Sequence, residues 1–102
     1  MKKIINGKMY NTETAKVLGT AYSNAPANSF EYWKETLFQK KNGEYFLYGH
    51  GGPTSRYAEY ADMNNWSGGE KFTPFTETEA MKWVEKYLSA EDYCEIFGEP
   101  EE

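Results

Sequence analysis

Residues Phe30–Tyr48 read FEYWKETLFQKKNGEYFLY. Apolar and aromatic side chains alternate with polar ones on both sides of Asn42-Gly43, a dipeptide typical of two-residue hairpin turns. A period of two places one row of side chains on a buried face and the other row toward solvent. The segment therefore predicts an antiparallel hairpin, and it is the strongest hairpin signal in the chain.

Weaker signals precede this hairpin. Asn6-Gly7 joins Lys3–Asn6 to Lys8–Tyr10 and predicts a short N-terminal hairpin. Asn11 and Thr12 are good N-cap residues, so we expect a short helix over residues 13–18 that ends at Gly19. Small and polar residues around Pro26 predict a loop over residues 20–29.

The chain continues after Tyr48 as Gly49-His50-Gly51-Gly52-Pro53. Three glycines and a proline remove side-chain packing and one backbone donor, so we expect an irregular, flexible connection here. Further along we expect a strand in residues 55–61, a polar loop containing Trp66 over residues 64–69, and a last strand over residues 71–75.

Two helices are expected at the C-terminus. Thr76 and Glu79 match a capping box, and apolar residues at helical spacing follow up to Leu88. Ser89 is expected to cap a final short helix that ends at Gly98 and turns its acidic residues outward. The pattern predicts an α+β fold: an antiparallel β-sheet with helices packed on one face.

The chain has 102 residues, which fits one compact domain over residues 1–102. Its single cysteine, Cys94, has no partner for an internal disulfide, and no apolar run near the N-terminus resembles a signal peptide or a membrane span. We therefore expect a soluble protein of the cytoplasm.

The acidic residues are unevenly distributed. All 11 lysines and arginines and 10 of the 16 acidic residues precede Ser89, whereas residues 89–102 hold six acidic residues and no basic one. A net charge of −5 argues against an ordinary nucleic-acid-binding face. Two interpretations of the acidic helix and tail over residues 89–102 stay open: a solvated terminus, or a surface that occupies a basic groove of a partner protein.

Residue patterns offer little support for catalysis. His50 is the only histidine, and with one cysteine far away it gives no metal-ligand spacing. The glycine run matches neither a P-loop nor a dinucleotide-binding fingerprint. A buried, inert thiol is the favoured interpretation of Cys94. We therefore expect no metal and no cofactor.

Aromatic residues are abundant, with nine Tyr, six Phe and three Trp. A core this small does not enclose them all, and five lie in or beside polar, glycine-rich segments: Tyr22, Tyr48, Tyr57, Tyr60 and Trp66. Tyrosine and tryptophan are enriched at interface hot spots. The alternative is that these rings line the edges of the sheet and are only partly buried.

Three segments carry a resemblance to a known family. They are IINGKMYNTETA (Ile4–Ala15), KNGEYFLYGHGGP (Lys41–Pro53), and PFTE (Pro74–Glu77) with Glu79-Ala80 and Trp83. Together they resemble small proteins of phages and conjugative elements in Gram-positive bacteria, some of which resemble anti-CRISPR inhibitors of type II-A Cas9. The resemblance implies a non-enzymatic accessory protein without catalytic residues. Many relatives carry an acidic residue where this chain has His50.

The expectation that follows is an anti-CRISPR protein that binds Cas9, or another host defence nuclease, in the bacterial cytoplasm and blocks guide RNA loading or DNA access. The expected partner-binding residues are Glu91, Asp92, Glu95, Glu99, Tyr48, Tyr57, Tyr60 and Trp66. No sequence-specific nucleic-acid binding and no membrane contact are expected, while self-association through a strand edge stays open.

Two alternative classes remain. The first is a non-inhibitory protein-interaction module of a mobile genetic element, whose acidic tail is merely solvated. The second is a small hydrolase or nuclease that uses His50 with Arg56 and a carboxylate such as Glu59 or Asp62.

Overall fold

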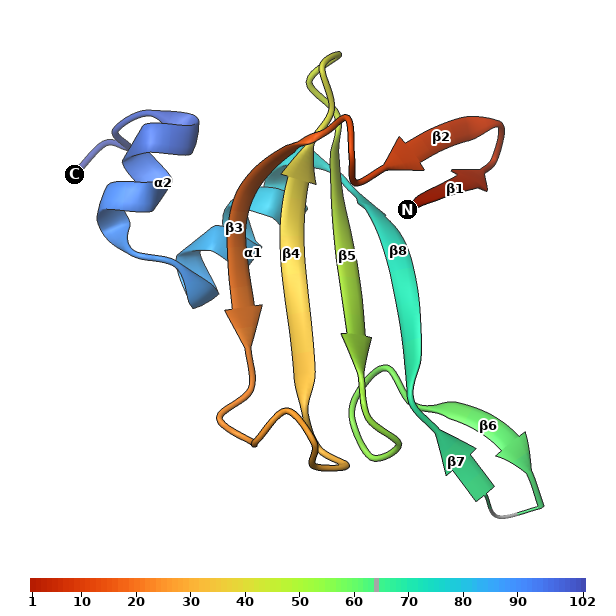
Figure 1. Ribbon diagram of the computed structural model, residues 1–102. Coiled ribbons are helices and arrows are strands. Elements are labelled where there is room, and N and C mark those ends of the chain that lie inside the picture. The colour runs from red at the N-terminus through yellow and green to blue at the C-terminus, as the bar shows by residue number, and fades with distance from the viewer. Residues whose placement is uncertain (64) are drawn as a thin grey trace.

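A computed structural model describes residues 1–63 and 65–102 of the chain. Within these residues it contains one four-stranded antiparallel sheet, two small hairpins and two helices (Figure 1). The elements are β1 (Lys2–Ile5), β2 (Lys8–Asn11), β3 (Lys16–Tyr22), β4 (Trp33–Gln39), β5 (Tyr45–Gly51), β6 (Glu59–Asp62), β7 (Asn65–Ser67), β8 (Gly69–Phe75), α1 (Glu77–Tyr87) and α2 (Ala90–Phe97).

The hairpin predicted around Asn42-Gly43 forms the centre of the sheet. Strand order is β3-β4-β5-β8, and every neighbouring pair is antiparallel. Gly43 has a φ of 94°, a left-handed conformation that glycine adopts without steric cost. The predicted hairpin is confirmed, and its alternation assigns Leu37 and Leu47 to one face of the sheet and Phe38 and Phe46 to the other.

Both helices pack on one face of the sheet, as the sequence predicts. Capping boxes begin α1 at Thr76 and α2 at Ser89, and Gly98 ends α2 with a φ of 88°. The core between helices and sheet contains seven buried residues: Ala21, Leu37, Tyr45, Leu47, Ala80, Trp83 and Val84. The expected α+β architecture is therefore confirmed.

The N-terminal hairpin covers part of the opposite face. Tyr10 of β2 is buried against a row of three phenylalanines, Phe38, Phe46 and Phe72. Lys40 lies 3.7 Å from the centroid of the Tyr10 ring, and Glu44 forms ion pairs with Lys8 and Lys40 at 2.6 and 3.1 Å. The predicted β1–β2 hairpin is thus confirmed. The Lys8–Glu44 ion pair and the contact of Lys40 with the Tyr10 ring hold it against the turn between β4 and β5.

The helix expected over residues 13–18 is wrong, because this segment enters β3. The sequence Ala15-Lys16-Val17-Leu18 suits a strand as well as a helix, and pairing with β4 decides between them. Gly19 lies inside the strand, where a Cβ atom would collide with the Leu88 side chain. Gly19 therefore permits close packing of the helix layer instead of ending a helix.

The glycine run was also predicted incorrectly, since β5 continues through Gly51. After Gly52 the chain folds back against the helix-covered face. A Cβ atom at Gly49 would collide with the Tyr57 ring, and one at Gly51 would collide with Ser55. The glycines therefore give room for a returning loop, which is the close backbone approach that glycine allows in a strand.

The next two predictions need correction as well. Residues 55–58 form a turn, so only β6 fulfils the strand expected over residues 55–61. The loop expected over residues 64–69 contains β7, which pairs with β6, although its first residue, Asn64, lies outside the described residues. The last strand is confirmed as β8, beginning two residues earlier than expected.

Candidate partner-binding surfaces

The β6–β7 hairpin projects from one end of the sheet (Figure 1). Tyr60 and Trp66 are cross-strand partners on this hairpin, with ring centroids 5.5 Å apart in an edge-to-face arrangement. Tyr60 nevertheless remains 62% exposed and Trp66 56% exposed, and Met63, which lies between them in the sequence, is 79% exposed. The hairpin thus presents large apolar side chains whose burial would favour association with another molecule.

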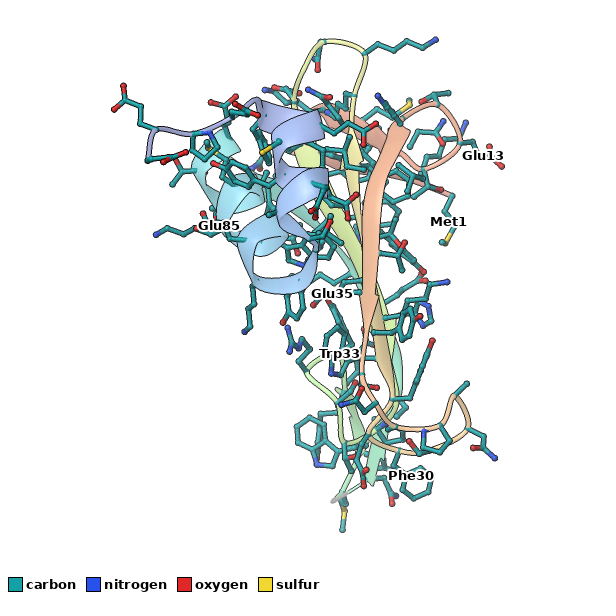
Figure 2. The ribbon with its side chains drawn as sticks, turned by 90° about the vertical axis from the view of Figure 1, so that its left-hand side faces the viewer. Met1, Glu13, Phe30, Trp33, Glu35 and Glu85 are labelled. Carbon is teal, nitrogen blue, oxygen red and sulfur yellow. The ribbon has the colours of Figure 1, made fainter. Side chains whose placement is uncertain are left out.

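Phe30 is another exposed aromatic residue at this end of the molecule. It lies in the loop between β3 and β4, is 67% exposed, and points outward at the same end of the molecule as the hairpin (Figure 2). We call Phe30, Tyr60, Met63 and Trp66 the aromatic end. Two of the predicted partner-binding residues, Tyr60 and Trp66, belong to it.

The acidic segment, residues 89–102, lies at the other end of the molecule in both views (Figures 1 and 2). Glu91, Asp92, Glu95 and Glu99 are all exposed. Part of this charge has a local role, since the Asp92 carboxylate accepts the Ser89 N–H at 3.4 Å in the capping box and Glu91 lies in the first helical turn. Glu95 and Glu99 have no such role.

Tyr48 lies on the sheet face opposite the helices. Its ring packs 4.9 Å from Phe72 and 6.0 Å from His50, and its hydroxyl donates a hydrogen bond to Glu70. Burial, followed by the nearby Glu70 carboxylate, raises the pKa of Tyr48 to about 12. Tyr48 is therefore half-buried in the sheet surface and lies apart from the aromatic end.

Tyr57 turns its hydroxyl inward, toward Glu35. Glu35 is 2% exposed and accepts three hydrogen bonds: from the Tyr57 hydroxyl at 2.6 Å, the Trp83 indole N–H at 2.9 Å and the Arg56 guanidinium at 3.1 Å. Burial first, then the Glu35 carboxylate, raise the pKa of Tyr57. The Tyr57 hydroxyl is thus engaged within the fold.

Sequence reasoning did not identify Glu35, although a signal was present. Glu35 shares the parity of Trp33 and Leu37 in β4, so strand alternation alone places it on the buried face. Arg56 also stacks on Trp33, 4.3 Å from the ring to the guanidinium carbon. Glu35 therefore joins the loop after β5 to α1 and fixes the chain just before the β6–β7 hairpin begins.

The catalytic constellation considered for His50 is not assembled. His50 lies on the open face beside Tyr32 and Tyr48, whereas Arg56 contacts Glu35 on the helix-covered face. The sheet separates these two side chains. Among residues 1–63 and 65–102, no group of three or more histidine, cysteine, aspartate or glutamate side chains is arranged to hold a metal ion.

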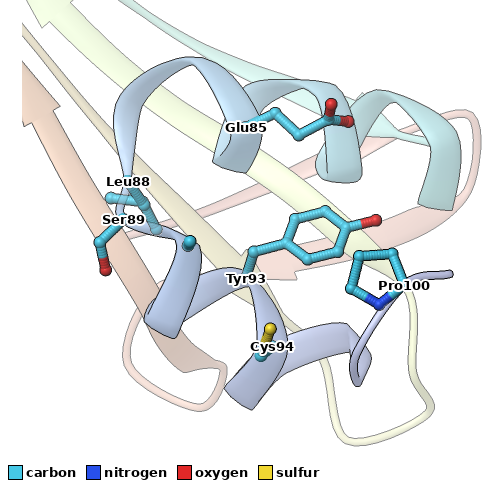
Figure 3. A pocket seen from close by; sticks show the side chains of 7 residues that line it. Glu85, Leu88, Ser89, Tyr93, Cys94 and Pro100 are labelled. Carbon is cyan, nitrogen blue, oxygen red and sulfur yellow. The ribbon is translucent and has the colours of Figure 1, made fainter. Parts of the chain in front are cut away.

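A shallow pocket lies between α1, α2 and the C-terminal tail (Figure 3). Cys94 lines it together with Glu85, Leu88, Tyr93 and Pro100. Cys94 is half-buried, so its expected full burial is only partly met. In the described part of the chain no helix is long and apolar enough to cross a membrane.

Comparison with family models, curated proteins and solved structures found no match to this chain.

Proposed function

We propose that the protein acts by binding another protein, and that it is an anti-CRISPR protein that inhibits a type II-A Cas9. The observation that carries the proposal is the pair of exposed rings, Tyr60 and Trp66, on a projecting hairpin. The identity of the partner rests on the sequence resemblance. In this proposal the protein works in the host cytoplasm and interferes with guide RNA loading or DNA access.

The aromatic end would anchor the complex. Tyr60 and Trp66 pack edge to face against each other and so lose little side-chain freedom on binding, which lowers the entropic cost of association. Desolvated aromatic anchors act mainly on the dissociation rate. Replacing both with alanine should therefore accelerate dissociation more than it slows association.

The acidic segment would add charge complementarity. Cas9-type effectors hold guide RNA and heteroduplex in positively charged channels, and exposed carboxylates would steer the protein toward such a surface. Glu91, Glu95 and Glu99 suit this role because their side chains are exposed. Asp92 is less suited, since its carboxylate already caps α2.

The test is Cas9 cleavage in vitro, with the protein added before or after guide RNA and with binding to apo and loaded Cas9 measured in parallel. Inhibition only when the protein is added first indicates competition for the guide-binding groove. Inhibition in both orders indicates a block at DNA recognition or cleavage. Absence of both binding and inhibition contradicts the proposal.

Variants separate the two surfaces. Glu91→Lys/Glu95→Lys keeps the Asp92 cap and should slow association by about tenfold at low salt, with less effect at high salt. Glu13→Lys, one exposed charge reversal outside the acidic segment, is the control, and it changes the net charge by half as much as the double variant. Full activity of the double variant contradicts a role for the acidic segment.

One observation favours the alternative of a non-inhibitory interaction module of a mobile element. Glu91 and Asp92 stabilise the N-terminal turn of α2, so their presence needs no partner protein. Only the rest of the acidic charge is left for a binding role. In that case the aromatic end alone binds a different partner, and neutralising residues 89–102 leaves binding unchanged.

A further inference from the structure

The outer edge of β3 has no backbone partner over its C-terminal half among the described residues. In the four-stranded sheet β3 is an end strand that pairs only with β4. The Ser23 N–H donates to the Trp33 carbonyl at 3.0 Å, and hydrogen-bonded positions alternate along an antiparallel ladder. The backbone groups of Ala21 therefore face β4, while those of Thr20 and Tyr22 point outward.

The C-terminal half of this edge lacks the features that usually prevent strands from pairing, since the register shift of β3 lies between Val17 and Gly19, before it. After Lys16, β3 carries no charged residue and no proline, and Tyr22 is 67% exposed. The strand at the opposite edge, β8, carries Glu70, Lys71 and Pro74. Charged residues, proline and bulges keep an edge from accepting another strand, so the β8 edge and the start of β3 are protected, whereas the C-terminal half of β3 is not.

The helices leave the C-terminal half of β3 open. α2 borders only the start of the strand, where Asp92 and Glu95 line a hollow with residues 16–18. Both views show the other half of β3 extending past the helices (Figures 1 and 2). A further strand has access to the outward groups of Thr20 and Tyr22.

We infer that this edge pairs antiparallel with β3 of a second copy of the chain, about a two-fold axis at Ala21. Thr20 then lies opposite Tyr22 of the second copy, and the two outward-facing backbone positions of each copy exchange hydrogen bonds. Ala21 of one copy lies opposite Ala21 of the other. They form a non-hydrogen-bonded pair, in which the two strands are closest and a small side chain fits. The two four-stranded sheets become one continuous sheet.

Self-pairing suits this segment better than a foreign strand. A two-fold antiparallel pairing uses the same residues on both sides, so it needs no second sequence. The uncharged run from Val17 to Tyr22 places no like charges opposite each other. In the dimer, the acidic segment of each copy lies beside the N-terminal half of its own β3 strand. These two halves point away from the two-fold axis in opposite directions. The mutual repulsion of the acidic segments is screened by salt, so dimerisation should strengthen as salt is added.

The test is sedimentation equilibrium of the full chain over a wide range of protein concentration, at low and high salt. We expect a reversible monomer–dimer equilibrium. Thr20→Pro removes an outward N–H without breaking the ladder to β4, and Tyr22→Lys places two lysines near the axis. Each should raise the dissociation constant by at least about tenfold. Val17→Lys, on the same strand but outside the overlap, is the matched control.

Circular dichroism spectra should be recorded for each variant to check that it folds. A dimer that both variants weaken and the control retains supports the pairing. A protein that stays monomeric at every concentration overturns it, as does a dimer that neither variant affects. A monomer whose binding to a separate protein is lost in Thr20→Pro also overturns it, because the edge then accepts a foreign strand. None of these readouts involves Cas9, so they are independent of the proposed function.

Discussion

Replacing Glu35 with alanine removes the common acceptor of three side chains that come from α1 and from the loop after β5. The Trp83 indole N–H and the Tyr57 hydroxyl lose their partner inside the core, where water has little access. Arg56 loses its carboxylate too, but its side chain is 47% exposed and regains hydration. The cost therefore falls mainly on Trp83 and Tyr57.

The magnitude follows from these two donors. A buried donor left without a partner costs about 1–3 kcal/mol, and relief of the buried carboxylate offsets part of the sum. We expect the free energy of unfolding to fall by about 2–4 kcal/mol. For a chain of 102 residues this lowers the melting temperature by about 10–20 °C, since the entropy of unfolding is about 0.2 kcal/mol per kelvin.

Urea and thermal unfolding followed by circular dichroism measure this loss. Arg56→Ala is the comparison, with an expected loss of about 1 kcal/mol because the arginine is half-exposed. Glu35→Gln keeps one acceptor oxygen and should lie between the two. If Glu35→Ala costs less than about 1 kcal/mol, or less than Arg56→Ala, the Glu35 carboxylate does not hold the loop to α1 and the reasoning fails.

Three further predictions concern packing and pH. Gly49→Ala should destabilise the fold by about 1–3 kcal/mol in the same assay, because the added methyl group displaces the Tyr57 ring; an unchanged midpoint contradicts this packing. The raised pKa values of Tyr57 and Tyr48, the latter about 12, mean that the unfolded chain releases these protons first, so stability should fall as pH rises above 10.0. Tyr57→Phe should flatten the alkaline decline, and an unaltered slope would exclude Tyr57 as its source. Hydrogen bonds from Lys8 first, then Lys40 and Asn42, lower the pKa of Glu44 to about 2, so its contribution is present above pH 4.5 and lost as pH falls through about 2. An NMR titration of the Glu44 carboxyl checks this value, and Lys8→Ala should raise it.

Local signals in the sequence predicted the elements whose determinants are close in sequence. The caps at Thr76 and Ser89 and the Asn42-Gly43 turn each satisfy backbone groups within a few residues, so a short segment contains the whole cause. The segment 13–18 has no such local determinant. Its strand depends on β4, which lies farther along the chain, and on the close approach of Leu88 to Gly19.

The same distinction explains the site residues. Exposure of Tyr60 and Trp66 follows from their polar surroundings in the sequence. The role of Gly49 could not be read from the sequence. Gly49 makes room for the ring of Tyr57, which lies eight residues later in a loop whose path the sequence does not specify. Glu35 was missed because glutamate is usually exposed to solvent, although strand alternation places it on the buried face. The three donors that make its burial tolerable come from segments far along the chain.

The separation of the two candidate surfaces has a testable consequence for how one partner would be bound. The aromatic end and the acidic segment lie at opposite ends of a molecule whose longest dimension is 50 Å. A partner that contacts both must span most of that length, and because the surfaces share no residue, their binding contributions should add. Combining Tyr60→Ala/Trp66→Ala with Glu91→Lys/Glu95→Lys should therefore weaken affinity by the product of the separate fold-changes. If the combined variant binds no more weakly than the aromatic variant alone, the partner uses only the aromatic end, and the acidic segment serves α2 and solvation.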